Sequence, residues 1–411
     1  MPELYQYPRF SLDERDRRWA AVRARMAEAN LDVIVCPNNT GHSTDFQANC
    51  RYLSHVGGGG DADVAVVFPL EGEVTAIATS AAARWPTVQE WTTDVREARR
   101  NYGRVAVERL KELGVEHGRI GITGLGEDAG TRTPEGTIGY GFWKQLREAF
   151  PEAELVDATS ILTKIRYVKS DEEVATLQKS MDIVELGIEA KIAAARVGAL
   201  DWEVWAAAQY GMMRAGSEIP VHCNWISGPN PVRTLTRPTM RTLEKGDMIL
   251  NEMEANWMGY RSQAVQPVFI EVINPVHAEL FKVQKEIFET VMEQLKPGIS
   301  VKEISDLAEA TGKKAAPSSG PAANAECKLT MHGRGAGDDG PIITGHARDP
   351  EHLAVRLEEN MVFIFKPSAE TPGCTHICTW GDTVLITPDG GRRMGKRPHE
   401  LAVSGGEDAM S

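Results

Sequence analysis

Apolar and polar positions along the first 160 residues follow the period of a helix in some segments and of a strand in others. Apolar residues fall at helical spacing in 11–30, 103–114 and 142–150. Apolar runs typical of buried strands occupy 31–37, 63–70, 73–79, 119–124 and 153–158. Strands and helices that alternate in this way predict an α/β layer domain.

The pattern changes near residue 166, which predicts two domains, residues 1–165 and 166–411. Ser170, followed three residues later by Glu173, forms a capping-box pattern at the start of a long helix expected from Asp171 to about Arg196. Further helices are expected over 200–215 and 275–295, and strands before Val272, over 361–370 and over 375–387. The segment 310–330, rich in Ala, Pro, Gly and Ser, predicts a loop.

The segment from Lys245 to Val272 predicts a β-hairpin, because two alternating runs are interrupted at Gly259 and Tyr260. Its first run carries Glu252 and Glu254, whereas its second run carries Gln263 and Gln266. Carboxylates on neighbouring strands commonly bind a divalent cation, and here amides stand on the second strand. The hairpin is therefore the first place to look for a functional site.

Composition and charge exclude several classes of partner. The 411 residues are enough for two domains with their own cores. The net charge of −13 repels phosphate backbones and anionic lipids, so we expect neither nucleic-acid nor membrane partners. The N-terminal segment lacks a secretory pattern, and no apolar run approaches the roughly 20 residues of a membrane span. We therefore expect a cytoplasmic protein.

The six cysteines form no disulfide framework and fit reduced thiols in a cytosol. The tightest cluster is CTHIC, in which Cys374, His376 and Cys378 alternate on a predicted strand. One face of that strand could present all three side chains to a soft metal ion. The favoured alternative is a half-buried strand with packed thiols, because structural zinc sites usually have four ligands.

Six segments in a fixed order carry a resemblance to a known family. They are RYLSH, RYVKSDEEV, KGDMILNEMEANWMGYRS, MHGRGAGDDGP, EENMVFIFKPS and GDTVLIT. In this order they resemble the creatinase, prolidase and aminopeptidase P superfamily over nearly the whole chain. The resemblance implies an α/β N-terminal domain followed by an α+β C-terminal catalytic domain of the pita-bread fold.

The resemblance also implies five metal-ligand positions, which its metallopeptidases fill with two Asp, one His and two Glu. In this chain the five positions hold Glu252, Gln263, His332, Lys366 and Gly381. A neutral amide adds no negative charge, glycine offers no ligand, and an ammonium group repels a cation. We therefore expect no metal ion and no cofactor, although a single ion held by His332 with Glu252 and Glu254, or with the CTHIC residues, stays open.

These departures resemble creatinase and ectoine hydrolase, the metal-independent members of the superfamily. They imply a metal-independent hydrolase that cleaves an amide, amidine or lactam-like C–N bond in a small metabolite. Glu252 is the implied nucleophile or general base, His332 the implied acid or base, and Lys366 the electrostatic support. The alternatives are that Glu252 and Lys366 form a purely structural ion pair, and that His332 is a core or surface residue whose hydrogen bonds are made without a substrate.

Further candidate substrate-binding residues are Glu254, Gln263, His222, Arg233, Asp338, His376, Trp225 and Arg51. His222 is the histidine nearest in sequence to the loop where creatinase carries a catalytic one. Arg233 could bind a carboxylate, and Trp225 could line an aromatic pocket; a surface arginine and core packing are the alternatives. Arg51 lies in the segment that reaches the partner's cleft in creatinase, so the resemblance implies a homodimer.

Two other functions stay open beside the hydrolase. A pocket with Glu, Lys and His side chains can move protons without delivering water, which suits a lyase or decarboxylase acting on a small acid. A catalytically inactive pita-bread module that binds peptides or proteins is the other. The retention of an acidic residue and a histidine beside a new lysine favours an enzyme with a small-molecule substrate.

Overall fold

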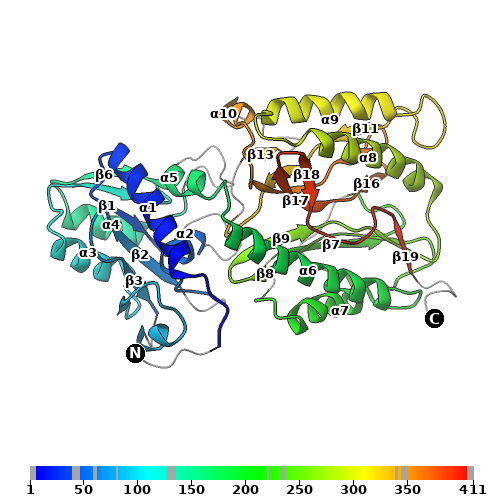
Figure 1. The fold of residues 1–411 in the computed structure, drawn as a ribbon. Helices are drawn as coiled ribbons and strands as arrows, with labels where there is room; N and C mark the ends of the chain where they lie inside the picture. Colours follow the sequence, from blue (N-terminus) through cyan, green and yellow to red (C-terminus); the bar gives the residue numbers. More distant parts are fainter. Residues whose placement is uncertain are drawn as a thin grey trace. The chain divides into compact units, whose positions relative to one another are not determined.

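The computed structural model of this chain describes residues 6–38, 47–58, 63–79, 82–126, 136–219, 222–232, 237–337, 341–343 and 350–404. The chain divides into two compact units. The first comprises Met1–Glu172 with Ala336–Gly340, and the second comprises Glu173–Gly335 with Pro341–Ser411. Figure 1 shows the helices and strands of both units, each of which is described by itself.

The first unit is a six-stranded sheet with helices on both faces. Its helices are α1 (Leu12–Glu28), α2 (Ala48–Ser54), η1 (Ala82–Thr87, a 3-10 helix), α3 (Tyr102–Glu112), α4 (Tyr140–Ala149) and α5 (Thr159–Ile165). Its strands are β1 (Val33–Cys36), β2 (Val64–Pro69), β3 (Thr75–Ala78), β4 (Asp94–Glu97), β5 (Arg119–Ile122) and β6 (Glu154–Asp157). The strand order is β4-β3-β2-β1-β5-β6, with β2 antiparallel to both neighbours and the other pairs parallel.

Apolar side chains cover both faces of this sheet. Ile34 packs in the cluster that contains Val22 of α1, whereas Val33 and Val35 pack in the cluster that contains Leu110 of α3. A strand that is covered on both faces must be apolar at every position. This explains why the central strands appear in the sequence as continuous apolar runs rather than alternating ones.

The second unit combines three sheets with two pairs of long helices. Its helices are α6 (Asp171–Ala194), which begins at the boundary, α7 (Asp201–Arg214), α8 (Pro275–Gln294), α9 (Val301–Ala315) and the short α10 (Pro350–Ala354). Its strands are β7 (Cys223–Gly228), β8 (Met248–Trp257), β9 (Tyr260–Ala264), β10 (Val268–Ile270), β11 (Glu326–Lys328), β12 (Met331–Gly333), β13 (Ile342–Ile343), β14 (Val362–Phe365), β15 (Ser368–Glu370), β16 (Ile377–Thr379), β17 (Asp382–Thr387), β18 (Gly390–Arg393) and β19 (Ala402–Ser404).

The sheets of the second unit are layered between its helices. The first sheet has the order β19-β10-β8-β7, with β9 paired to β8; the other two are β11-β15-β16 and β13-β12-β14-β17-β18. Figure 1 shows α6 and α7 on one side of this unit and α8 and α9 on the other. Within the described residues, no helix is both long enough and apolar enough to cross a membrane.

The predicted hairpin between Lys245 and Val272 is confirmed. Strands β8 and β9 pair antiparallel, with Trp257 opposite Tyr260. The two-residue turn consists of Met258 and Gly259, which both have positive φ angles, of 55° and 82°. Positive φ at both central residues is the geometry of the tight turns that match the twist of paired strands.

The predicted loop over 310–330 is wrong at its beginning, because α9 continues to Ala315. Ser300 and Glu303 form a capping box, in which the Ser300 hydroxyl accepts from the Glu303 backbone N–H and the Glu303 carboxylate accepts from the Ser300 backbone N–H. The buried side chains of Ile304 and Ala308 lie one turn apart on the face that packs inward. The cap and this face start a helix that runs into the first residues of the Ala-rich segment.

Lys191 of α6 fixes this helix to the strand that carries Glu252. Its Nζ is fully buried and donates to Asn251 Oδ1 at 2.6 Å and to the carbonyl oxygen of Gln266 at 2.7 Å. Burial lowers the pKa of Lys191 to about 7. The contact therefore joins a helix and a strand through an amine that loses its proton near neutral pH.

We expect Lys191→Met to flatten the pH dependence of the free energy of unfolding above about pH 7. In the folded chain the amine is mostly neutral there, whereas in the unfolded chain it keeps its proton up to its ordinary pKa of 10.5. The unfolded state therefore binds more protons, so Lys191 makes stability rise with pH by up to about 1.4 kcal/mol per pH unit. Urea unfolding across this pH range measures the slope.

Lys282→Met serves as the matched control, because Lys282 is an exposed lysine on α8. This control should keep the wild-type slope. If Lys191→Met also kept the wild-type slope, Lys191 would not be the group that loses its proton on folding.

Candidate active site

Polar side chains from four elements of the second unit meet at Glu252. Glu252 lies on β8, Gln263 on β9, Asn224 on β7, and Lys366 directly follows β14. Asn224 stands opposite Glu252 in the register of β7 and β8. His222, two residues before Asn224, precedes β7 and completes the cluster. Residues distant in sequence are thus placed together by strand pairing and by the joining of two sheets.

Both oxygens of the Glu252 carboxylate have polar partners. Lys366 Nζ donates to Oε1 at 2.8 Å and also to Gln263 Oε1 at 3.1 Å. His222 Nε2 lies 2.9 Å from Oε2, and Asn224 Nδ2 donates to the same oxygen at 3.4 Å. The carboxylate therefore carries an ammonium group on one oxygen and an imidazole on the other.

The pKa of Glu252 lies well below its ordinary value. Burial alone would raise it, but the Lys366 ammonium and the hydrogen bonds from His222 and Lys366 outweigh burial. Glu252 is therefore ionised at neutral pH and accepts a hydrogen bond from the Nε2–H of His222. In the neutral imidazole, this bond leaves Nδ1 of His222 as the acceptor nitrogen of the ring.

This cluster does not fit the pair of metal ions that the resemblance implies. The Lys366 ammonium lies between Glu252 and Gln263, where it would repel a cation. Gly381 has no room for a side chain, since a Cβ there would lie 2.5 Å from Lys366 Cβ. In the part of the chain that the structure describes, no group of three His, Cys, Asp or Glu side chains could hold a metal ion.

His332 and Glu254 have other surroundings than Glu252. His332 is buried on β12, with its Nδ1 3.4 Å from the carbonyl oxygen of Gly333. Glu254 is buried on β8 and forms ion pairs with Arg261 and Arg334. The described contacts of Glu252 thus involve His222 rather than His332, which was the histidine expected to act with it.

Trp225 is a core residue. It follows Asn224 on β7 and therefore points to the opposite face of the sheet. Its indole ring is fully buried, and Nε1 donates to Asp201 Oδ1 at 2.6 Å. The structure thus gives Trp225 the packing role that was the alternative to an aromatic substrate pocket.

The CTHIC segment is not the single strand that its alternation predicts. Strand β16 covers only Ile377–Thr379, and Cys374 has a positive φ of 52° in the turn before it. The ring of His376 packs against the ring of His277, with centroids 5.3 Å apart. The prediction of one strand face shared by Cys374, His376 and Cys378 is therefore wrong.

Three other candidates are not part of the described cluster. Arg51 lies on α2 in the first unit, where its side chain approaches Gly57 and Gly58. Arg233 and Asp338 lie outside the described residues.

Asn224, by contrast, is a cluster residue that was not predicted from the sequence. Its spacing of two from His222 in VHCNW is the signal that could have found it, because residues i and i+2 of a strand share a face.

Comparison with known proteins places this chain in a family. Residues 175–388 match the description "Metallopeptidase family M24", and residues 18–168 match "Creatinase/Prolidase N-terminal domain". The chain belongs to metallopeptidase family M24. This M24 chain is 25% identical to creatinase from Bacillus sp. (strain B-0618) over 307 residues, which are 72% of this chain and 70% of the relative. It is 25% identical to Xaa-Pro dipeptidase from Pyrococcus furiosus over 268 residues, which are 65% of this chain and 74% of the relative.

Solved structures share the fold of this M24 chain. An Xaa-Pro dipeptidase from Bacillus anthracis superimposes with a TM-score of 0.76 at 18% identity, over 95% of this chain and 99% of the other. The superfamily resemblance is confirmed by the two matched domains. So is the predicted fold, an α/β N-terminal domain followed by an α+β pita-bread domain.

The comparisons contradict the expected metal-independent hydrolase of a small metabolite. Xaa-Pro dipeptidases recur among the relatives, and prolidases recur among the structural neighbours. The predicted closeness to the metal-independent members is not confirmed, because creatinase and an Xaa-Pro dipeptidase are equally similar to this chain, at 25% identity. The relatives named here support neither the lyase nor the inactive binding module. The expectation was wrong because it rested on four replaced metal-ligand positions. Such replacements indicate which ligands are lost, but they do not indicate which relatives act on similar substrates.

We expect Lys366→Met to raise the pKa of Glu252 and to destabilise the fold. Without the ammonium group, His222 and Asn224 are the described residues that still oppose the effect of burial on this carboxylate. Removing one member of a buried ion pair costs about 3 kcal/mol, because the other charge stays behind. Carbon-detected NMR of the labelled carboxyl group gives the pKa, and urea unfolding at pH 7 gives the stability.

The double variant Glu252→Gln/Lys366→Met is the matched control, because it removes both charges. It should recover most of the lost stability. In the wild type, the contribution of the lowered pKa is present above the ordinary value of 4.5 and is lost as pH falls through the lowered pKa. A Glu252 pKa that stayed low in Lys366→Met would show that another group controls this carboxylate.

Proposed function

We propose that this chain is a hydrolase that cleaves the peptide bond of a short peptide, of about dipeptide size, at the Glu252 cluster. The observation that carries the proposal is an ionised carboxylate held between an imidazole and an ammonium group. The substrate class is supported by relatives named Xaa-Pro dipeptidase. Hydrolysis of an amide needs a base for water and a donor for the carbonyl oxygen, and the cluster offers both.

His222 is the proposed general base. Its Nε2–H is held by Glu252, so the free lone pair is on Nδ1. The side chain of His222 is 19% exposed, which lets a water molecule approach the ring. A carboxylate that orients an imidazole and stabilises its protonated form makes it a more effective base.

Lys366 is the proposed donor to the substrate carbonyl oxygen. Its ammonium group has three N–H donors, and the contacts in the described residues use two of them, on Glu252 and Gln263. Its side chain is only 6% exposed, so the third donor acts where few water molecules weaken its field. A donor in such surroundings stabilises the negative charge that develops when water attacks.

The proposed reaction proceeds in two proton transfers. His222 Nδ1 takes a proton from water as the water oxygen bonds to the carbonyl carbon, and the resulting oxyanion is stabilised by Lys366. The imidazolium then gives this proton to the peptide nitrogen, the C–N bond breaks, and an acid and an amine leave. Glu252 stays ionised throughout and stabilises the imidazolium.

We expect His222→Gln and Glu252→Gln each to lower kcat/KM for dipeptide hydrolysis by about 100-fold or more. Both substitutions keep the size of the side chain but remove the base or the charge that orients it. Chromatographic measurement of released amino acids, with a dipeptide panel that includes Xaa-Pro, checks this expectation. Assays run both with and without added Mn²⁺, Co²⁺ or Zn²⁺ keep the result independent of metal content.

Glu148→Gln, at an exposed glutamate of α4, is the matched control and should leave activity unchanged. Wild-type rates in both His222→Gln and Glu252→Gln would refute the assigned roles. A wild-type protein that released no amino acid from any dipeptide of the panel would refute the substrate class.

A homodimer, a cytoplasmic location and the lack of nucleic-acid and membrane partners stay predictions. The proposal itself implies only a small-molecule partner, the peptide substrate. It gives no role to Arg233 or Asp338, which stay predicted substrate-binding residues.

A further inference from the structure

The sheet face that carries Glu252 becomes apolar one step along its strands. Ile226 of β7 stands opposite Leu250 of β8, in the same register that places Asn224 opposite Glu252. Residues i and i+2 of a strand share a face, so Ile226 and Leu250 lie on the face of the Glu252 cluster. Two residues of a strand span about 7 Å. The charged cluster therefore borders directly on aliphatic side chains.

A third element adds to this aliphatic surface. Ile377, the first residue of β16, packs together with Ile226 against a core cluster that contains Leu250 and Val265. Ile226 and Ile377 are only partly buried, whereas the core residues on which they rest are buried. We call Ile226, Leu250 and Ile377 the apolar floor. The floor thus keeps aliphatic surface within reach of a ligand.

The accessible part of this sheet face runs from the cluster toward the floor. The side chains of His222 and Glu252 are 19% and 23% exposed. In the other direction along β8, Glu254 is 2% exposed and forms ion pairs with Arg261 and Arg334, which are buried as well. A ligand bound at the cluster can therefore extend over the floor more readily than over Glu254.

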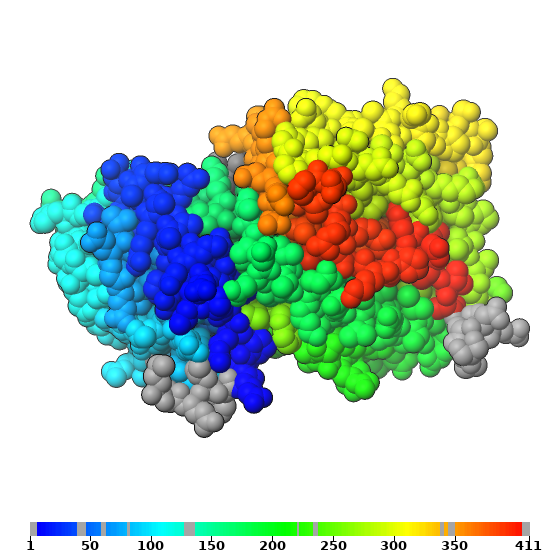
Figure 2. All heavy atoms as spheres, in the orientation of Figure 1, coloured from blue at the N-terminus to red at the C-terminus, as the bar shows by residue number. Residues whose placement is uncertain are grey.

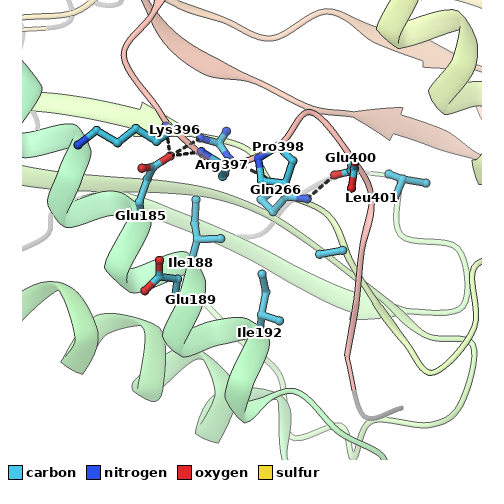
Figure 3. A pocket seen from close by; sticks show the side chains of 11 residues that line it. Glu185, Ile188, Glu189, Ile192, Gln266, Lys396, Arg397, Pro398, Glu400 and Leu401 are labelled. Carbon is cyan, nitrogen blue, oxygen red and sulfur yellow. Dashed lines mark hydrogen bonds and ion pairs between the residues drawn. The ribbon is translucent and has the colours of Figure 1, made fainter. Parts of the chain in front are cut away.

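The cavity beside α6 is a separate feature of the second unit. Its volume is about 460 Å³, and Figure 3 shows α6 side chains along one wall and the segment 396–402 along the other. In Figure 2 the red C-terminal segment lies on the surface directly beside the green of α6. Ile192, which lines this cavity, packs in the core cluster of Trp225 and Ile249, on the sheet face opposite to the floor. None of the described residues that line the cavity belongs to the floor or to the Glu252 cluster.

We propose that the apolar floor binds the side chain of the first residue of the dipeptide, whose carbonyl carbon is attacked, and so selects an apolar residue there. The second residue, which leaves as the amine, lies away from the floor. This assignment rests on the hydrolysis proposed for the Glu252 cluster, and it adds the residue class that the site accepts.

The position of His222 determines which end of the substrate lies over the floor. In the proposed reaction His222 gives its proton to the peptide nitrogen, so the leaving residue lies on the side of His222. Along β7 the order is His222, Asn224 and Ile226, which places the floor on the other side of the cluster. The first residue is therefore directed toward the floor, and an aliphatic side chain can span the distance of one strand step.

The chemistry of the floor distinguishes apolar from polar side chains. An aliphatic side chain that covers aliphatic surface gains free energy because both are removed from water. A polar side chain of the same size loses hydrogen bonds to water, and the three aliphatic side chains of the floor offer none in return. Leucine and asparagine are similar in size, so a comparison of the two isolates this effect.

Rates with four dipeptides test the proposal on the full-length protein. We expect kcat/KM for Leu-Ala to exceed that for Asn-Ala by about ten-fold or more, and the values for Ala-Leu and Ala-Asn to agree within about three-fold. Chromatography of the released amino acids gives the rates. Equal values for Leu-Ala and Asn-Ala would overturn the proposal.

Variants of the floor locate the preference. Ile226→Thr and Ile377→Thr should each lower the ratio of Leu-Ala to Asn-Ala by about three-fold or more and leave the ratio of Ala-Leu to Ala-Asn unchanged. Ile192→Thr, at the partly buried isoleucine of the cavity beside α6, is the matched control and should keep both ratios. Wild-type ratios in both floor variants, or a change confined to the second residue, would overturn the assignment.

A gain of selectivity separates recognition from loss of folding. Ile226→Asp places a carboxylate on the floor and should reverse the preference, so that Lys-Ala is cleaved faster than Leu-Ala. Partial unfolding lowers both rates but does not create a new preference. A variant that still favoured Leu-Ala would show that the first side chain does not reach Ile226.

Binding without turnover separates the floor from the reaction. In His222→Gln, isothermal titration should show Leu-Ala binding about ten-fold more tightly than Asn-Ala, and His222→Gln/Ile226→Thr should lose most of this difference. If the wild type cleaved no dipeptide but this difference were found, the proposed hydrolysis would fail and the floor would stand. Equal dissociation constants in His222→Gln would overturn the floor, even if hydrolysis were established.

Discussion

The ion pair between Lys366 and Glu252 is the interaction on which the candidate active site depends. It joins β8 of one sheet to the residue after β14 of another. A buried carboxylate without a cation would take up a proton, because burial disfavours its charge. The lysine keeps Glu252 ionised, and the ionised carboxylate in turn determines which nitrogen of His222 carries the proton. One ammonium group thus sets the charge and hydrogen-bonding state of the whole cluster.

The same lysine explains the glycine beside it. Gly381 pairs with Val265 in an isolated bridge and accepts from Arg397, and its Cα lies against Lys366. Any larger residue would have to displace the Lys366 side chain or its backbone. The two replacements at these positions are therefore one structural change rather than two independent losses. A side chain at position 381 would collide with Lys366, so a single substitution there could not restore a dinuclear metal centre.

Much of the fold was predictable because its signals are local. The apolar runs of β1 and β2 and the alternation of β8 and β9 each report burial of the strand itself. Local signals do not predict which face of β7 carries Asn224 and which carries Trp225, because this depends on the register of β7 with β8. The prediction of one strand face over CTHIC was wrong for a related reason. Alternating residues share a face only where the chain is extended, and Cys374 lies in a turn. Helix α9 was not predicted, although its capping box is a local signal. The Ala-rich composition of 310–330 predicted a loop that begins before the helix ends at Ala315.

One lysine contacts each face of strand β8: Lys191 contacts Asn251, and Lys366 contacts Glu252. The two contacts have different electrostatic consequences because the partners of the lysines differ in charge. Asn251 and Glu252 are consecutive on the strand and so point to opposite faces. Among the described residues, Lys191 donates to an amide oxygen and a carbonyl oxygen, and burial lowers its pKa to about 7. Lys366 finds a carboxylate, whose pKa it lowers instead. A neutral partner cannot compensate the loss of hydration of an ammonium group, whereas an anionic one can. The strand is therefore fixed from both sides, and the charged pair of Lys366 and Glu252 lies on the face that carries His222, where a reaction that moves protons requires charged groups.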